Sequence, residues 1–148
     1  MKILVYLNFK MNEESLYLES VELLKELIST QSFSFHEENT ATLLENWLNK
    51  NSIPFKRHVN NIYCYNKYYD EEKPNILLNS HHDTVEPNDS YTNDPYEPIV
   101  DQGKLYGLGS NDAGASLVSL LSTFKFFYDC KNLNYNLIFL ASAEEEKS

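Results

Sequence analysis

The chain has 148 residues, of which 22 are acidic and 12 basic, and its formal net charge is −10 at pH 7. This length suits one domain with a buried core, and the negative charge disfavours nucleic acid and anionic membranes as partners. No segment is long and apolar enough to predict a membrane span. Cys64 and Cys130 form no CxxC pair, which indicates reduced thiols and a cytoplasmic protein.

Two amphipathic helices are predicted in the first third of the chain. Apolar residues recur at helical spacing over residues 13–29, in a stripe to which we assign Tyr17 and the leucines around it. Ser34 and Glu37 have the spacing of a capping box, which predicts the start of a second helix that ends near residue 51.

Strands are predicted for the middle and the end of the chain. Residues 54–59 and 61–66 are short, β-prone and adjacent, as in a hairpin. Residues 75–80 and 135–142 are nearly continuous apolar runs, which is typical of strands buried on both faces. Residues 113–128 between them have a helical pattern. Strand, helix and strand in this order predict a parallel crossover, and therefore an α/β fold.

Two segments lie outside this pattern. Residues 1–11 are interpreted as an N-terminal extension or a misassigned start, because the more conventional sequence begins at Met11. Residues 81–111 form a long loop rich in Pro, Asp and Asn. Loops of this length usually have a function or contain small elements, and we expect a short strand around residues 104–107.

Candidate metal ligands follow three successive elements. His81, His82 and Asp83 come after the first apolar strand, Asp112 precedes the crossover helix, and residues 144–146 follow the next strand. Because the carboxyl ends of parallel strands share one edge of a sheet, these groups should meet there. Imidazole and carboxylate are donors that zinc accepts, so the sequence predicts a metal site.

Each group also has a simpler interpretation. The histidines could lie in a solvated loop, Asp112 could cap the helix that follows it, and the three glutamates could form a charged surface. Unrelated surface residues have no reason to fall at three successive element ends. This order favours a shared site.

Three segments resemble one enzyme family: "SHHDTVEP", "DPYEPIVDQGKLYGLGSNDAG" and "ASAEEEKS". They are similar to the acetylornithine deacetylase and succinyl-diaminopimelate desuccinylase family of di-zinc amidohydrolases and carboxypeptidases. The resemblance implies a three-layer αβα fold with a mostly parallel central sheet, as in zinc exopeptidases. It also implies that residues 12–148 are the N-terminal part of the catalytic domain, truncated before a lid and dimerisation domain and a C-terminal part.

The resemblance also assigns roles to residues. His81 would bind one zinc and Asp83 would orient its imidazole, while Asp112 would bridge two zincs and precede a cis peptide. Glu145 would be the general base and Glu146 a ligand of the second zinc. A shift of one residue would give these two roles to Glu144 and Glu145.

The implied activity is hydrolysis of an N-acyl amino acid such as acetylornithine, in arginine biosynthesis, by a cytoplasmic homodimer. Cobalt or manganese would accept the same donors as zinc. The alternatives are a dipeptidase or carboxypeptidase of the same family and a non-catalytic α/β module. Leu108 and Ala113 stand where many relatives have Arg and Met, which weakens any transfer of substrate detail. With two protein ligands per zinc, this chain alone is expected to bind metal weakly and to lack useful hydrolysis.

Overall fold

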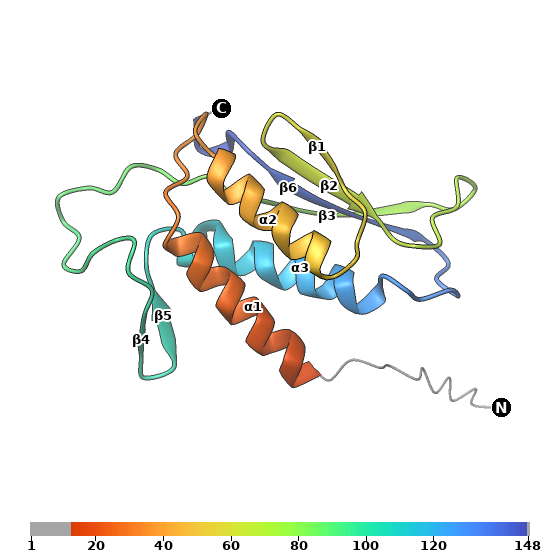
Figure 1. The fold of residues 1–148 in the computed structure, drawn as a ribbon, viewed down its shortest axis with the longest axis horizontal. Coiled ribbons are helices and arrows are strands. Elements are labelled where there is room, and N and C mark those ends of the chain that lie inside the picture. The colour runs from red at the N-terminus through yellow and green to blue at the C-terminus, as the bar shows by residue number, and fades with distance from the viewer. Residues whose placement is uncertain (1–12, 148) are drawn as a thin grey trace.

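The computed structural model describes residues 13–147, so the predicted extension over residues 1–11 lies outside the described residues. Two helices begin the described chain, and strands, a third helix and a last strand follow (Figure 1). None of the described helices is long and apolar enough to cross a membrane. In chain order the elements are α1 (Glu13–Ile28), α2 (Glu38–Lys50), β1 (Lys56–His58), β2 (Asn61–Tyr65), β3 (Asn75–His81), β4 (Ile99–Asp101), β5 (Lys104–Tyr106), η1 (Ser110–Ala115), α3 (Ser116–Phe127), β6 (Asn136–Ser142) and η2 (Glu145–Lys147).

The main sheet has the strand order β1-β2-β6-β3. β3 and β6 pair in parallel on either side of α3 in the sequence, which confirms the predicted crossover and the α/β class. β1 and β2 form the predicted hairpin, and β2 joins β6 in antiparallel register. The sheet of the described residues is therefore mixed: β3 and β6 form its parallel pair, and the hairpin of β1 and β2 joins in antiparallel register. A separate hairpin of β4 and β5 confirms the strand expected in the long loop.

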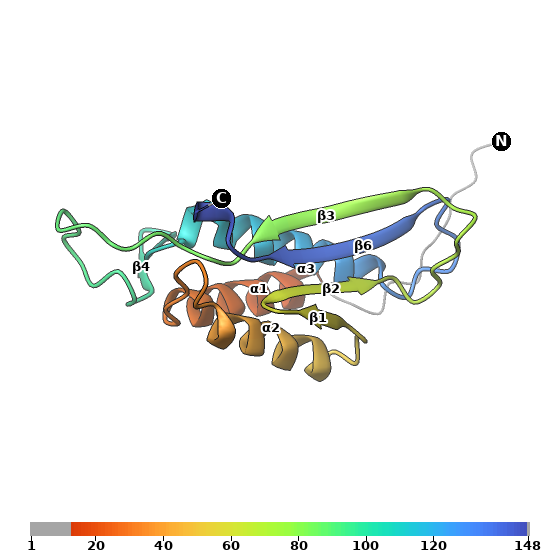
Figure 2. The same ribbon diagram turned by 90° about the horizontal axis from the view of Figure 1, so that it is seen from above.

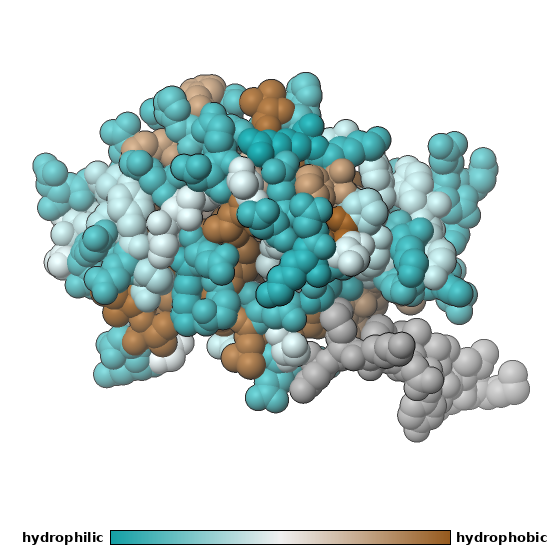
Figure 3. Space-filling model, viewed as in Figure 1, coloured by the Kyte–Doolittle hydropathy of each residue, from teal (hydrophilic) through white to brown (hydrophobic). Residues whose placement is uncertain are grey.

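The core lies between one face of the sheet and the three helices. Ile62, Cys64, Leu137, Phe139 and Ala141 alternate along β2 and β6 and are all buried against the helices. Figure 2 shows the helices together beside the sheet. The described residues therefore form two of the layers of the expected αβα fold, the sheet and the helices on one of its faces. Seen from the side of Figure 1, the surface is mostly hydrophilic with small apolar patches (Figure 3).

The strand β3 differs from its prediction because it is an edge strand. Its register partner β6 lies between two strands, whereas β3 pairs with β6 alone. Ile76 and Leu77 are 41% and 55% exposed, so burial on both faces is wrong for β3. Continuous apolar sequence alone did not distinguish an edge strand from a central one.

The α1 helix buries a stripe that differs slightly from the predicted one. Leu23, Leu24 and Leu27 are buried as expected, but Tyr17 is 67% exposed. The prediction that Tyr17 belongs to the buried stripe is therefore wrong, because Tyr17 lies at the edge of the stripe on the side that faces solvent.

Candidate metal centre

The sheet brings the predicted ligands together at the carboxyl ends of β3 and β6. His81 is 8% exposed, and its Nε2 lies 3.1 Å from Asp112 Oδ1 and 3.8 Å from Glu145 Oε2. One donor atom each from His81, Glu145 and Glu146 lie within 4.8 Å of one another. The expected convergence of the three element ends is therefore observed.

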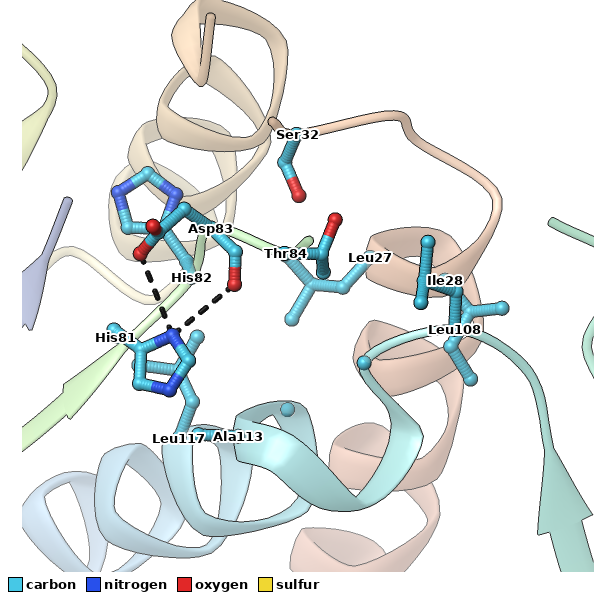
Figure 4. Close-up of a pocket in the computed structure, with 12 residues that line it drawn as sticks. Leu27, Ile28, Ser32, His81, His82, Asp83, Thr84, Leu108, Ala113 and Leu117 are labelled. Atoms are coloured by element: carbon cyan, nitrogen blue, oxygen red, sulfur yellow. Dashed lines mark hydrogen bonds and ion pairs between the residues drawn. The ribbon is translucent and has the colours of Figure 1, made fainter. Parts of the chain in front are cut away.

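The other nitrogen of His81 faces Asp83 (Figure 4). Nδ1 lies 3.1 Å from the backbone carbonyl oxygen of Asp83 and 3.4 Å from its Oδ1. Because both are acceptors, Nδ1 carries a proton, and Nε2 is directed towards Asp112. Burial lowers the pKa of His81, but the hydrogen bonds to Asp112 and Asp83 outweigh it and leave the pKa above its ordinary value. Asp83 is thus placed to orient the imidazole.

Asp83 is itself held by three donors. It is 1% exposed; its Oδ2 accepts from the Ser34 hydroxyl at 2.7 Å and from the Glu146 N–H at 3.0 Å, and its Oδ1 accepts from the Glu145 N–H at 3.2 Å. Burial raises the pKa of Asp83, but these hydrogen bonds outweigh it and lower the pKa overall. The carboxylate therefore stays ionised and connects β3 to the glutamates after β6.

The predicted capping box is wrong. The α2 helix has Glu37 at its N-cap with no side-chain cap bond, and the Ser34 hydroxyl binds Asp83 instead. Glu37 is fully buried, and its carboxylate accepts from the backbone N–H groups of Phe35 and Glu144 and from the Asn60 side chain. Analysis of the sequence missed both roles, because the spacing that suggests a cap contains no information about partners on distant strands.

His82 points away from the site, as alternation along an extended strand requires. It is 5% exposed, and its Nε2 donates to the Asn60 carbonyl at 2.9 Å. Its Nδ1 lies 2.9 Å from the Thr40 hydroxyl. Burial lowers the pKa of His82, so the ring is a neutral part of the core next to the charged site.

Asp112 enters the site from the turn before α3. The peptide bond between Asp112 and Ala113 is cis, which confirms the geometry implied by the resemblance. Asp112 has non-helical backbone angles and α3 begins only at Ser116, so the interpretation of Asp112 as a simple helix cap is wrong. Gly114 packs where a Cβ would lie 2.6 Å from both Leu24 Cδ1 and the Gly109 carbonyl oxygen. The turn therefore requires glycine there.

A pocket of about 370 Å³ opens beside these groups. Asp112 and Glu146 supply its charged lining, and Val85, Tyr91 and Leu108 are among the other residues that line it. The pocket is thus a space directly next to the candidate ligands.

The donor set suits divalent cations. One imidazole nitrogen and three carboxylates converge, and such oxygen and nitrogen donors are those that zinc accepts. Burial and the negative charge of Asp112 raise the pKa of Glu146, as expected for carboxylates crowded together. A bound cation would neutralise this accumulated charge.

Comparisons with known proteins agree with the site. Residues 77–148 match the profile of peptidase family M20/M25/M40. The chain is 25% identical over 131 residues to a succinyl-diaminopimelate desuccinylase of Nitratiruptor sp., with 87% of this chain and 35% of that protein covered. It is 31% identical over 143 residues to an acetylornithine deacetylase of Shigella sonnei, with 86% and 36% covered. The chain thus spans about a third of the length of these curated relatives.

A solved structure shows the same fold. A Bacillus subtilis protein described as a dinuclear metal binding peptidase of the M20 family superposes with a TM-score of 0.67 and is 20% identical. The match covers 90% of this chain and 37% of that one.

Proposed function

We propose that the chain belongs to peptidase family M20/M25/M40, whose profile residues 77–148 match, and that it carries the metal site of a family hydrolase that cleaves amide bonds. The observation that supports the proposal most strongly is the meeting of His81, Asp112, Glu145 and Glu146 at one edge of the sheet. These residues come from three separate elements, and no single helix or loop would gather them.

In this proposal His81, Asp112 and Glu146 would hold two divalent cations, and Asp112 would be the ligand common to both. Zinc is the proposed metal, and cobalt or manganese fits the same donors. When bound, such ions polarise the carbonyl of an amide substrate and lower the pKa of the attacking water. Asp83 keeps the imidazole of His81 in the orientation that the ligand role requires.

Glu145 is the proposed general base. Its side chain is 59% exposed and therefore accessible to substrate, while its backbone N–H is held by Asp83. It takes a proton from the attacking water and passes it to the leaving amine. Glu145 and Glu146 share the group around His81, which Glu144 does not join among the described residues; this supports the assignment over the shift by one residue.

The proposed substrate is an N-acyl amino acid such as acetylornithine, because two named relatives act on acylated amino acids. A dipeptide is the second candidate, since the solved structure described above is named a peptidase. We further propose, on the resemblance alone, that residues 12–148 form the N-terminal part of the catalytic domain, and that the whole enzyme is a cytoplasmic homodimer active in arginine biosynthesis.

Zinc titration by calorimetry tests the proposal. The chain is expected to bind zinc, and Asp112→Ala should weaken binding by at least about tenfold, because a shared ligand is lost. Asp101→Ala is the matched control, since Asp101 is an exposed aspartate on β4 outside the site. Binding that is equal in all three proteins, or absent from the wild type, would contradict the metal site and favour a non-catalytic module.

A further inference from the structure

Four successive backbone N–H groups after β6 are each bound by a side chain from another part of the chain. We call residues 143–146 the glutamate turn. Ala143 donates to Asn61 Oδ1 at 3.1 Å and Glu144 to Glu37 Oε1 at 3.1 Å. The next two donate to the carboxylate of Asp83, at 3.2 and 3.0 Å. The turn is therefore fixed from outside, and Glu37 is the one carboxylate among these acceptors that the proposed mechanism does not use.

Glu37 is a carboxylate with no exposure to solvent. Its Oε1 also accepts from the Phe35 N–H at 2.8 Å, and its Oε2 accepts from Asn60 Nδ2 at 2.9 Å. Asn60 is in turn fixed, because its Oδ1 accepts from Arg57 Nη2 at 2.8 Å. Burying an ionised group is costly unless donors surround it. Here three N–H groups meet one carboxylate, and a carboxylate satisfies them without presenting a donor of its own.

The contact at Glu144 is made where the chain bends after β6. Glu144 has φ of 63°, in the left-handed region that non-glycine residues rarely adopt. Glu144 lies between the end of β6 and the start of η2, and Glu145 and Glu146 are the first two residues of η2. The hydrogen bond to Glu37 secures the one residue whose backbone angles set the direction of the two glutamates that follow.

We propose that Glu37 is a positioning residue, which anchors the glutamate turn so that Glu145 and Glu146 face His81. The inference deepens the proposed function and rests on it only for the roles of Glu145 and Glu146. The hydrogen bonds of the Glu37 carboxylate go to Phe35, Asn60 and the Glu144 amide, and none of these is a candidate ligand. Glu37 acts through the Glu144 amide.

The isosteric variant Glu37→Gln isolates this role. The amide keeps the size of the side chain but places an NH₂ group against an existing donor, either Asn60 Nδ2 or the backbone N–H groups of Phe35 and Glu144. Glu38→Gln is the matched control. Glu38 is exposed in the first turn of α2, so this substitution removes the same charge one residue away without touching the glutamate turn.

Two measurements on the full 148-residue chain test the proposal. By NMR, the Glu144 amide should exchange with solvent at least about tenfold faster in Glu37→Gln than in the wild type. By absorption titration with cobalt, the folded variant should bind about 10 to 100 times more weakly and show an altered cobalt spectrum, as loss of an outer-shell partner does elsewhere. The control should match the wild type in both. If Glu37→Gln does not fold, Glu37→Asp, which keeps the charge but shortens the reach, gives the same two readouts.

Three outcomes separate the possibilities. Unchanged exchange at Glu144 would overturn the anchoring role. Faster exchange with unchanged cobalt affinity and spectrum would show a purely structural contact and would also overturn the proposal. If the wild type binds no cobalt, the proposed metal function fails, while the exchange data still decide whether Glu37 anchors the turn.

Discussion

The two ends of β6 are both fastened by buried side chains, but with opposite chemistry. At the amino end, Asn136 is fully buried; its Nδ2 donates to the Asp70 carbonyl at 2.8 Å and its Oδ1 accepts from the Asp70 N–H at 2.9 Å. Asn66 Oδ1 accepts from the Leu137 N–H at 2.8 Å beside it. At the carboxyl end the corresponding acceptors include two carboxylates, Asp83 and Glu37. One end is held by neutral amides and the other largely by buried charge.

The difference shows what the charge is for. Amides fasten a loop to a strand end at a lower desolvation cost than carboxylates, so the fold alone does not require buried ions. The charged end is also where His81 and the candidate ligands lie. There, Asp83 fixes a backbone turn and orients an imidazole at the same time. We infer that the carboxyl end accepts a less stable arrangement because the same groups serve the site.

The largest expected effect is at Glu145, where the catalytic role of the side chain can be separated from the structural role of the backbone N–H. In Glu145→Gln the backbone N–H that Asp83 holds is unchanged, so fold and zinc binding should persist. Loss of the general base should lower turnover of an N-acyl amino acid about 10² to 10⁴-fold. Hydrolysis by the zinc-loaded whole enzyme, with and without the substitution, and calorimetric zinc binding measure the two effects. Unchanged turnover with zinc still bound would refute the role of Glu145.

The next effect concerns the neutral end. Asn136→Ala removes a side chain that also donates to the Lys73 carbonyl at 3.2 Å and to Asn75 Oδ1 at 2.8 Å, and leaves buried groups unpaired. Urea unfolding should show a loss of about 2–4 kcal/mol, with cobalt affinity of the folded protein unchanged. Asn134→Ala, at an exposed position two residues away, is the control and should have little effect. A large fall in metal affinity in Asn136→Ala would mean that the two ends are not independent.

A third substitution, at the charged end, should change cobalt affinity, which Asn136→Ala should leave unchanged. Asp83→Asn should lower cobalt affinity by about 10 to 100-fold, because it orients the imidazole of His81 less firmly and places an NH₂ group against the N–H donors of the glutamate turn. Ser34→Ala removes one donor to the same carboxylate and should give a smaller loss in the same titration. If Ser34→Ala has the larger effect, the hydroxyl does more than support Asp83.

The sequence predicts most of the local structure and the membership of the site. The apolar periodicity of residues 13–29 and 113–128 identifies α1 and α3 because it reflects local helical spacing. The order strand, helix, strand then places His81, Asp112 and the glutamates at one edge. This prediction depends on topology and not on side-chain detail.

The remaining features depend on contacts between distant residues. The Ser34 hydroxyl meets Asp83, 49 positions away, and Glu37 meets the Glu144 amide, 107 positions away. The four-residue motif from Ser34 to Glu37 predicts a capping box equally well whether or not such partners exist. The exposure of Leu77 is unpredictable for the same reason, since it follows from the position of β3 at the sheet edge.

The smallest expected effect tests whether charge matters at the neutral end. There, Lys67 Nζ lies 2.9 Å from Asp129 Oδ2, with both side chains largely exposed. Hydrogen bonds from Lys67 and Tyr68 lower the pKa of Asp129, so the pair stabilises the fold above the ordinary pKa of an aspartate and loses this effect as the pH falls through the lowered value. Urea unfolding of Asp129→Asn should therefore differ slightly from the wild type at neutral pH, less in high salt, and progressively less as the pH falls below the ordinary pKa of an aspartate. A large difference at neutral pH, or one that persists in acid, would show that the amino end of β6 depends on an ion pair, and the contrast between the two ends would then be one of degree.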